Sequence, residues 1–325
     1  MTERLDVVAI GNAIVDVVAS VEDEFLRENG VEKGVMTLID QDRAAALYAA
    51  MPQAREISGG SAANTAAGLG AMGARAGFVG RVRDDQLGRI FAHDIRALGV
   101  HYDGPIATEG AETSRCLVLV SPDGERSMST FLGASTELVP SDIDEAVLAR
   151  AEWLYLEGYL YDTPEAKQAF AHAIRAVKAG GGRASLTVSD PFCVERHRAD
   201  FHRLLPELDL LFANRAELLS LYQTEDLETA LAAIARDVPL AAITLSGEGA
   251  IAVRGQARAH VPARKVRIVD TTGAGDLFAA GFLAGLVQGA DDAASARMGC
   301  AAAAEIITHI GARPEADLAG IIAKA

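Results

Sequence analysis

The sequence predicts an α/β fold with a mostly parallel central sheet flanked by helices. From residue 153 onward, short apolar runs alternate with helical stretches of about 10–15 residues, which is typical of right-handed βαβ crossovers. Polar residues repeatedly follow these runs, at the strand ends where parallel sheets bind ligands. The composition agrees, because 50% of the 325 residues are hydrophobic but only 5% are aromatic, as in closely packed helices and sheets.

Each element is predicted from its own stretch of sequence. Strands are predicted from β-branched and apolar runs over residues 7–10, 17–19, 36–39, 76–79, 115–120, 126–131, 153–156, 184–188, 208–212, 241–245 and 266–269. Helices are predicted from the small-residue and amphipathic stretches over residues 22–28, 41–50, 61–72, 86–98, 164–178, 276–288 and 292–309. No repeat, low-complexity tract or convincing linker interrupts this order.

Charge and cysteine content narrow the class of function. The net charge of −15 disfavours nucleic acid or an anionic membrane as a partner. Cys116, Cys193 and Cys300 form no CxxC or metal-ligand pattern, so we expect buried free thiols. The first residues lack the apolar core of a signal peptide, and no run of about 18 apolar residues is present. We therefore expect a cytoplasmic protein without a membrane span.

Polar groups and glycines follow the first strands. Asn12 and Asp16 come after the strand at 7–10, where an open α/β sheet would grip a polar small molecule. Capping and turning the chain would explain both residues equally well. Gly59 and Gly60 would let a ligand lie against the backbone, and Asn64, one helical turn later, could hydrogen-bond it. The alternative is that this helix needs small residues to pack tightly.

Two stretches, 15–40 and 100–135, are predicted to form a small second sheet, a lid over the site. The second contains a hairpin signal, because a Ser-Pro-Asp-Gly-Glu turn joins two strand-like runs. Arg126 lies on this hairpin. A cation on a mobile lid can close on a transferring phosphate and stabilise its charge. A solvated or ion-paired side chain is the commoner fate of a lone arginine.

A glycine turn lies between the strand predicted at 266–269 and the helix predicted at 276–288. Backbone N–H groups at such a helix start lack partners, and the helix dipole adds positive potential. Gly273, Ala274 and Gly275 could therefore cradle a phosphate. Asp276 is either a plain N-cap or a base beside the phosphate that it helps to transfer.

A second polar pair opens another helix. Asn214 and Glu217 are three residues apart and share one helix face, where they can order the waters around Mg²⁺. The pattern alone favours an ordinary capping box instead. His309, near the end of the last long helix, could flank a nucleotide base or simply lie favourably at a helix C-terminus.

Two nucleotide-binding motifs are excluded. Residues 68–73 match GxGxxG, but they end a predicted helix, whereas the dinucleotide fingerprint follows a strand and opens a helix. An NAD-dependent oxidoreductase is therefore a remote alternative. No GxxxxGK[ST] occurs, so the chain is not a P-loop enzyme.

The order of the motifs resembles the ribokinase-like carbohydrate and nucleoside kinases, the PfkB family. The motifs are Gly59-Gly60 with Asn64, Asn214-x-x-Glu217, and Asp270-Thr-Thr-Gly-Ala-Gly-Asp276. The resemblance spans nearly the whole chain. It implies one ribokinase-like domain over residues 1–325, with a Rossmann-like sheet and a small β lid. It also implies transfer of the ATP γ-phosphate to a primary hydroxyl.

The resemblance assigns roles within this site. Asp276 matches the family's catalytic base, and Gly273, Ala274 and Gly275 match its anion hole. Asn214 and Glu217 match the element that binds Mg²⁺ and phosphate, in which Glu217 would act through water. Thr244, Ser246, Gly247 and Gly249 match the ATP-site loop, with His309 near the base. Asp270, Thr272 and carbonyls near Gly311 correspond to a monovalent-cation site of related enzymes, which K⁺ could occupy.

Residues 11–16 and 126–134 look most like those of adenosine kinases. This resemblance implies that Asp16 binds the ribose hydroxyls and that Arg126 contacts phosphate. It places Ile14, Met36, Leu132, Ala134 and Tyr159 around the base. Asn12, Gly59, Gly60 and Asn64 complete the acceptor site. Ser61 stands where ribokinases often have a lysine, so it offers no cation.

We therefore expect an ATP-dependent phosphotransferase that acts on a nucleoside, with adenosine as the acceptor that fits best and AMP as its product. Asp276 would take the hydroxyl proton while the four N–H groups of residues 273–276, Mg²⁺ and Arg126 neutralise phosphate charge. A sugar kinase of the same family, acting on ribose or fructose, is the first alternative. A non-catalytic ligand-binding relative is the second. Either a monomer or a homodimer is compatible with the pattern.

Overall fold

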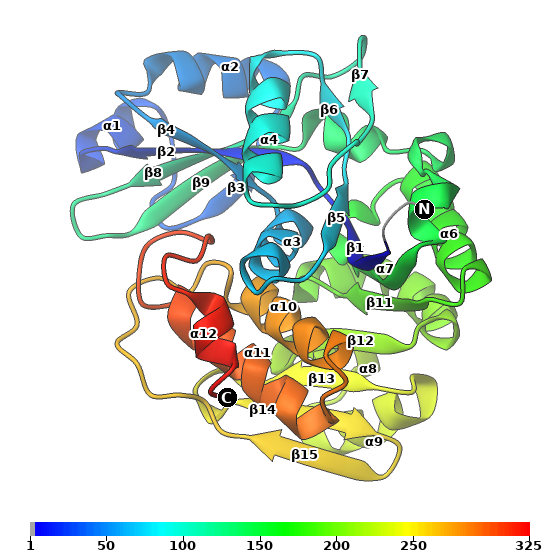
Figure 1. Cartoon of the computed structure of the whole chain (residues 1–325). Coiled ribbons are helices and arrows are strands. Elements are labelled where there is room, and N and C mark those ends of the chain that lie inside the picture. Colours follow the sequence, from blue (N-terminus) through cyan, green and yellow to red (C-terminus); the bar gives the residue numbers. More distant parts are fainter. Residues whose placement is uncertain (1–3) are drawn as a thin grey trace.

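The structure, a computed structural model, describes residues 4–325 and contains one large sheet and two smaller ones (Figure 1). The large sheet has the strand order β15-β14-β13-β12-β11-β10-β1-β5. Its strands are β1 (Leu5–Ile10), β5 (Ala76–Val79), β10 (Ala151–Glu157), β11 (Arg183–Thr187), β12 (Leu210–Asn214), β13 (Ala241–Thr244), β14 (Ala250–Arg254) and β15 (Ala257–Val261). Neighbours from β5 to β13 pair in parallel, and only β14 and β15 pair antiparallel. The predicted mostly parallel sheet is confirmed.

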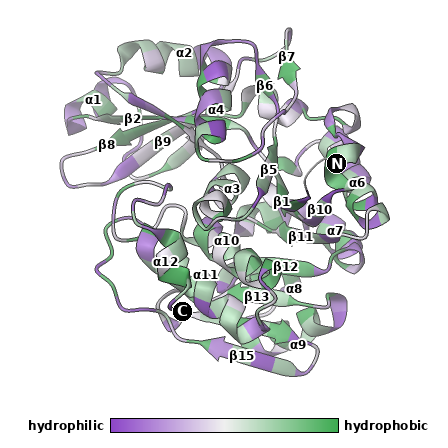
Figure 2. Ribbon diagram, viewed as in Figure 1, coloured by the Kyte–Doolittle hydropathy of each residue, from purple (hydrophilic) through white to green (hydrophobic). Residues whose placement is uncertain are grey.

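Helices cover both faces of the large sheet. Successive residues of a strand point to opposite faces, and β1 shows the result. Val7 and Ala9 join a core with α3 (Ser61–Ala71), α10 (Ala274–Val287) and α11 (Asp292–Ile306). Val8 and Ile10 join a second core with α6 (Pro164–Ala179), α7 (Pro191–Leu204), α8 (Arg215–Tyr222) and α9 (Leu227–Asp237). Figure 2 shows hydrophobic residues on the central strands between these two layers.

Helices α10 and α11 pack closely together because three glycines lie between them. A Cβ added to Gly281 would lie 2.6 Å from the carbonyl oxygen of Met298. One added to Gly285 would lie 2.7 Å from Ser295 Oγ, and one on Gly299 2.7 Å from the carbonyl oxygen of Phe278. Protein interiors have few voids, so a side chain at these positions would push the helices apart.

The small sheet has the strand order β3-β9-β8-β2-β4 and lies to the upper left in Figure 1. Its strands are β2 (Ile14–Ser20), β3 (Met36–Leu38), β4 (Arg55–Gly59), β8 (Ser114–Val120) and β9 (Arg126–Phe131). Strand β2 pairs in parallel with β8 and antiparallel with β4. Sequence reasoning did not predict β4, because its Arg-Glu-Ile-Ser-Gly sequence has a single large apolar residue. This strand leads directly into Gly60 and α3.

The remaining elements complete the chain. The helices are α1 (Asp23–Glu28), α2 (Gln41–Ala50), α4 (Gln86–Ala97), α5 (Glu145–Leu148) and α12 (Leu318–Ile322), and a short third sheet pairs β6 (Val82–Arg83) with β7 (Ile106–Ala107). Single 3-10 turns are η1 (Gly133–Glu137), η2 (Pro140–Asp142), η3 (Gly158–Leu160), η4 (Leu205–Glu207) and η5 (Ser246–Glu248). Most predicted helices agree with these bounds to within a few residues.

The strand predicted at 266–269 is wrong. These residues belong to an irregular segment between β15 and α10, and Val266, Ile268 and Val269 are 39%, 63% and 49% exposed. Their β-branched side chains suit a strand only where a neighbouring strand supports them, and the sheet ends instead at β15. The hairpin of β14 and β15 that forms this edge was not predicted.

Two expectations from composition can be compared with the structure. Cys116, Cys193 and Cys300 are buried and free, as predicted. Among the described residues, none of the helices combines the length and the apolar character that a membrane crossing requires.

Candidate active site

The carboxyl ends of the parallel strands open into a cavity of about 910 Å³. Thr187 and Asn214 at the ends of β11 and β12, and Thr244 at the end of β13, line one wall. Gly275 and Asp276 at the start of α10 line the opposite wall. This volume is within the range of small-molecule sites, and the position is where open α/β sheets bind ligands.

The anion turn, residues 273–276, opens α10 as predicted. Gly273 occupies the N-cap with φ +78°, a conformation that glycine adopts without steric cost. A Cβ there would also lie 2.9 Å from Ala312 Cβ. Within residues 4–325, the N–H groups of Gly275 and Asp276 meet no protein acceptor, whereas Ala274 donates its N–H to Thr271 at 3.2 Å. Fewer than the four expected N–H groups are therefore free to bind an anion.

Asp276 does not cap its helix, so the N-cap interpretation is wrong. Its carboxylate accepts hydrogen bonds from Ser61 Oγ at 2.6 Å and from Asn64 Nδ2 at 2.9 Å. Thr65 Oγ1 donates to its carbonyl oxygen at 3.2 Å. Burial raises the pKa of Asp276, while the bonds from Ser61 and Asn64 and the charge of Arg313 partly oppose that shift. The site thus joins the start of α10 to the start of α3.

Asp16 lies on β2 beside the paired glycines. A Cβ on Gly59 would lie 2.4 Å from Asp16 Oδ2, and one on Gly60 2.2 Å from the carbonyl oxygen of Asn12. Both glycines are therefore needed for close packing, and Gly60 also has φ +97°. Burial raises the pKa of Asp16 to about 6, partly offset by Arg313 and Arg126. No protein donor in the described chain pairs with this carboxylate.

Glu157 is a site residue that sequence reasoning missed. It ends β10 and is 1% exposed. Its carboxylate accepts from Asn12 Nδ2 at 2.7 Å and from the Ala62 N–H at 2.7 Å. Burial raises its pKa to about 7, although these donors favour the charged form. Its position at the carboxyl end of a central strand was the signal that could have identified it.

The five residues expected around an acceptor base lie on several elements. Ile14 is on β2, Met36 on the edge strand β3, and Leu132 and Ala134 at η1, while Tyr159 is in η3. Ala134 is fully buried, whereas Met36 and Tyr159 are 48% and 37% exposed. Tyr159 donates its N–H to Ser189 Oγ at 3.0 Å, and Ser189 lines the cavity. None of the five is among the residues that line the cavity at the strand ends.

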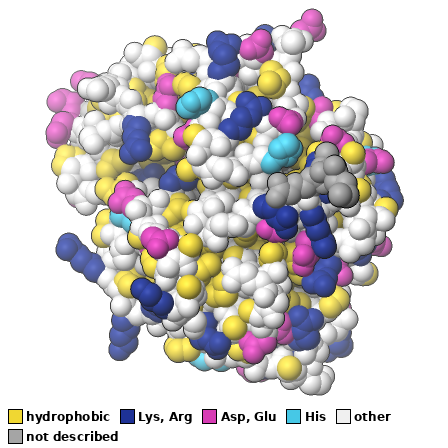
Figure 3. Space-filling view, in the orientation of Figure 1, with side chains coloured by type: hydrophobic (Ala, Val, Ile, Leu, Met, Phe, Trp, Pro, Cys, Tyr) yellow, Lys and Arg dark blue, Asp and Glu magenta, His cyan; other side chains and the backbone are white. Residues whose placement is uncertain are grey.

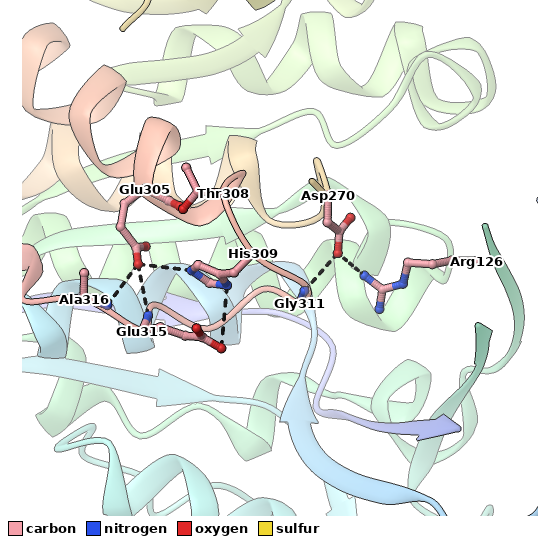
Figure 4. A network of polar contacts seen from close by, with 8 residues as sticks. All are labelled: Arg126, Asp270, Glu305, Thr308, His309, Gly311, Glu315 and Ala316. Atoms are coloured by element: carbon pink, nitrogen blue, oxygen red, sulfur yellow. Dashed lines mark hydrogen bonds and ion pairs between the residues drawn. The ribbon is translucent and has the colours of Figure 1, made fainter. Parts of the chain in front are cut away.

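Arg126 connects the small sheet to the segment before the anion turn (Figure 4). Its Nη1 donates to Asp270 Oδ2 and, at 2.9 Å, to Thr272 Oγ1. Asp270 also accepts from the Gly311 N–H at 2.9 Å and from Thr272. Burial alone would raise the pKa of Asp270, but these donors and the charge of Arg126 hold it below its ordinary value. Because these oxygens already face donors, they do not fit a monovalent cation while Arg126 is docked.

Asn214 and Glu217 form the capping box that the pattern favoured. Asn214 Oδ1 accepts from the Glu217 N–H at 2.9 Å, and Glu217 Oε2 accepts from the Asn214 N–H at 2.8 Å. Both residues also line the cavity. Burial raises the pKa of Glu217 to about 7, with the charge of Asp190 adding to the shift. Both Glu217 oxygens accept bonds from Asn214, but each can accept one more hydrogen bond, so this pair on the cavity wall fits the waters around a hydrated Mg²⁺.

The ATP-site loop expected at 244–249 lines the cavity, but His309 does not. Thr244, Ser246, Gly247 and Gly249 are all cavity residues. His309 Nε2 instead forms a hydrogen bond with Glu305 Oε1 at 3.1 Å. The same oxygen accepts hydrogen bonds from the N–H groups of Glu315 and Ala316 (Figure 4). His309 lies three residues beyond the end of α11, and through Glu305 it braces the chain that follows this helix.

The irregular segment 262–268 forms the outer part of the same cavity. Arg264, Lys265, Val266 and Ile268 line it. Figure 3 shows Lys and Arg side chains along the lower left edge, where Figure 1 places the loop joining β15 to α10. In a protein of net charge −15, this segment is a local cationic region suited to an anionic ligand.

An anion turn beside a held carboxylate, at the strand ends of an α/β sheet, defines a phosphotransferase with an alcohol group as acceptor. The chain belongs to the pfkB family of carbohydrate kinases, whose family model matches residues 5–318. Kinases of this family use ATP, typically with Mg²⁺. The ribokinase-like fold and the separate small sheet expected from the motifs are both confirmed.

Both adenosine and sugar kinases are similar to this chain. The adenosine kinase from Sinorhizobium meliloti is 49% identical, with 99% of each chain covered and a TM-score of 0.90. A "probable sugar kinase protein" from Rhizobium etli CFN 42 is 47% identical, with 99% of each chain covered and a TM-score of 0.90. The fructokinase from Klebsiella pneumoniae is 31% identical over 241 residues, which are 71% of this chain and 77% of that protein.

Proposed function

We propose that this kinase moves the γ-phosphate of ATP to a primary hydroxyl of a nucleoside, with adenosine as acceptor and Asp276 as base. One observation carries the proposal. The Asp276 carboxylate, held by Ser61 at 2.6 Å and Asn64 at 2.9 Å, lies next to the unpaired N–H groups of the anion turn. A base and an anion site are thus placed together at the start of one helix.

The chemistry follows from this placement. Phosphoryl transfer needs mainly positioning and neutralisation of charge. Asp276 would accept the proton of the acceptor hydroxyl, and its raised pKa makes it a stronger base than an exposed aspartate. The N–H groups of Gly275 and Asp276 would bind the transferring phosphoryl oxygens. Bound Mg²⁺ would neutralise phosphate charge, and Asn214 and Glu217 would hold it through water.

A nucleoside acceptor is supported by the unpaired carboxylate of Asp16. A carboxylate without a protein donor can accept hydrogen bonds from two neighbouring hydroxyls, as a ribose offers. The 49% identity to the Sinorhizobium meliloti adenosine kinase favours the same acceptor. A sugar kinase is the second candidate, because the same carboxylate would also bind a free sugar and a fructokinase is 31% identical. Initial rates with adenosine, inosine, ribose and fructose as acceptors separate the two.

The Asp276→Asn variant tests the base. We expect kcat to fall by about 10³-fold, because removal of a general base typically costs that much, while ATP binding stays unchanged. ADP release and ATP titration measure the two quantities. Asp84→Asn, on the exposed surface beside Arg89, is the matched control. Undiminished turnover by Asp276→Asn would remove Asp276 from this role.

The small sheet, with segments 15–40 and 100–135, is proposed to act as the lid. The docked Arg126 supports this role, because it ties β9 to Asp270 at the edge of the nucleotide cavity. Arg126 would be released toward phosphate when both substrates bind. Adding K⁺ to Na⁺-free and K⁺-free buffer tests the alternative in which Asp270 and Thr272 hold a cation. A rise in activity on adding K⁺ would favour the cation, and unchanged activity the arginine.

A further inference from the structure

We propose that Arg313, in the loop after α11, is a positioning residue that orients the Asn64 amide and thereby the carboxylate of Asp276. This inference rests on the proposed role of Asp276 as base. Sequence reasoning did not single out Arg313. It follows Gly311-Ala312, about 40 residues beyond the anion turn, and only the fold brings it to α3.

Arg313 is anchored to the start of α3 and to the end of β4. Its Nη1 donates to Asn64 Oδ1 at 2.7 Å and to the carbonyl oxygen of Ala63 at 3.2 Å. Its Nη2 donates to the backbone carbonyl and, at 3.0 Å, to the hydroxyl of Ser58. The fork of donors therefore fixes the guanidinium against the backbone that carries Asn64.

The bond from Arg313 decides which way the Asn64 amide points. A guanidinium has donors only, so it can face the amide oxygen of Asn64 but not its NH₂ group. The Asn64 Nδ2 is then turned toward Asp276, to which it donates at 2.9 Å. Without Arg313 the amide could rotate and present its oxygen to the carboxylate. Asp276 would then keep only the Ser61 bond.

The residues next to Arg313 contact the other parts of the site. Gly311 donates its N–H to Asp270 at 2.9 Å. Ala312 lies against Gly273, where an added Cβ would be 2.9 Å from Ala312 Cβ. Three consecutive residues thus contact three parts of the site. Gly311 contacts the segment before the anion turn, Ala312 contacts the turn, and Arg313 contacts α3, whose Ser61 and Asn64 bind the Asp276 carboxylate. The loop is a single brace across the site, and Arg313 is its charged end.

Arg313 also supplies positive charge to a region of carboxylates. The charged and titratable groups that face Arg313 or Asp276 are Asp16 on β2, Asp94 on α4, and Tyr155 and Glu157 on β10. Arg126 on β9 faces Asp16. The charge of Arg313 lowers the pKa of both Asp16 and Asp276 against the effect of burial. Loss of this charge raises the pKa of both carboxyls.

The test compares Arg313→Met, Arg313→Lys and the exposed control Arg89→Gln. We expect Arg313→Met to lower kcat by about 100-fold, since small errors in placing a catalytic group cost that much. ATP KM should stay unchanged, and the acid limb of the kcat profile should move to higher pH. Arg313→Lys keeps the charge but not the fork, so its acid limb should match the wild type while kcat is reduced. Arg89→Gln should change neither quantity.

A merely structural role predicts something different. In that case Arg313→Met lowers thermal stability and reduces kcat equally at every pH, and the proposal is overturned. Should Arg313→Met fail to fold, the Arg313→Lys and Asn64→Ala pair decides. If Arg313 acts through Asn64, the double variant loses no more kcat than Asn64→Ala alone. Additive losses would show that the two residues act separately.

The same assays distinguish this inference from the proposed function. An inactive Asp276→Asn enzyme together with an unchanged acid limb in Arg313→Met would overturn the role of Arg313 alone. An active Asp276→Asn enzyme would overturn the base itself.

Discussion

The two ends of the site are built differently. At the end proposed to bind the acceptor, the side chains of Asn64, Glu157 and Asp276 are held by hydrogen bonds from other elements, and the Asp16 carboxylate beside them has no protein donor among the described residues. At the end proposed to bind the nucleotide, residues 244–249 and 262–268, the cavity wall contains glycines, short polar side chains and an irregular segment that carries Arg264 and Lys265 and whose Ile268 is 63% exposed. Glu157, by contrast, is 1% exposed.

This difference shows where precision is needed. The acceptor hydroxyl must be aimed at a phosphorus atom, so the groups that place it are fixed before it binds. The nucleotide needs mainly room and positive potential, which backbone amides and a cationic segment supply. Substitutions at the acceptor end should therefore change catalysis sharply, and those at the nucleotide end only slightly.

After the loss of turnover expected for Asp276→Asn, the largest effect is expected at Asp16. Asp16→Asn should raise the KM for the acceptor by about 100-fold, because a hydrogen bond to a charged group contributes up to roughly 3 kcal/mol. The KM for ATP should stay at the wild-type value, since Asp16 is not among the residues that line the nucleotide cavity. Steady-state kinetics with each substrate varied in turn measures both. Equal changes in the two constants would contradict the separation of the two ends.

Glu157→Gln should change how stability depends on pH. Folding raises the pKa of Glu157 from 4.5 to about 7 because the residue is buried. Between these two pKa values the folded state binds more protons at Glu157 than the unfolded state does. The free energy of unfolding of the wild type therefore falls as pH rises through this range. The wild type should lose about 2 kcal/mol relative to Glu157→Gln between pH 5 and pH 8. Urea melts at both values measure this.

Glu165→Gln, at an exposed position in the first turn of α6, is the control for the Glu157 experiment. Its stability difference from the wild type should be the same at both pH values. A Glu157→Gln difference that is equally independent of pH would mean that Glu157 stays charged in the folded protein.

Gly273→Ala tests the boundary between the two ends. The φ of +78° and the closeness of Ala312 should make this change cost about 1–2 kcal/mol of stability. Gly275→Ala is the matched control, because no atom lies within 4 Å of its added Cβ. It should leave the thermal midpoint unchanged and weaken ATP binding instead. Equal destabilisation by the two variants would contradict this division of roles.

The smallest effect is expected in the irregular segment. Ile268→Ala should leave stability within about 0.5 kcal/mol of the wild type, because the side chain is 63% exposed. The KM for ATP should rise by about threefold through lost apolar contact. Acceptor KM should not change. A large loss of kcat would show that this segment is as tightly organised as the acceptor end.

Local patterns predicted part of this site. The anion turn and Asp276 could be found because glycines and an acid at a helix start are a feature of contiguous sequence. Glu157 ends a central strand, so a local signal existed but was not used. Arg313 has no such signal, because its contacts with Asn64 and Ser58 depend on how the C-terminal loop crosses α3. The strand predicted at 266–269 failed since β-propensity does not show whether a partner strand exists.

The glycine-lined contact between α10 and α11 has a consequence for inherited variation. The carboxylate proposed as the base lies in the first turn of α10, while Gly281 and Gly285 lie about one and a half and two and a half turns further along the same helix. A larger residue at Gly281 or Gly285 would tilt α10 and move its N-terminal end away from α3. No atom that contacts a substrate would be changed. Substitutions that impair such a kinase should therefore be as frequent along the contact between α10 and α11 as around the bound ligands.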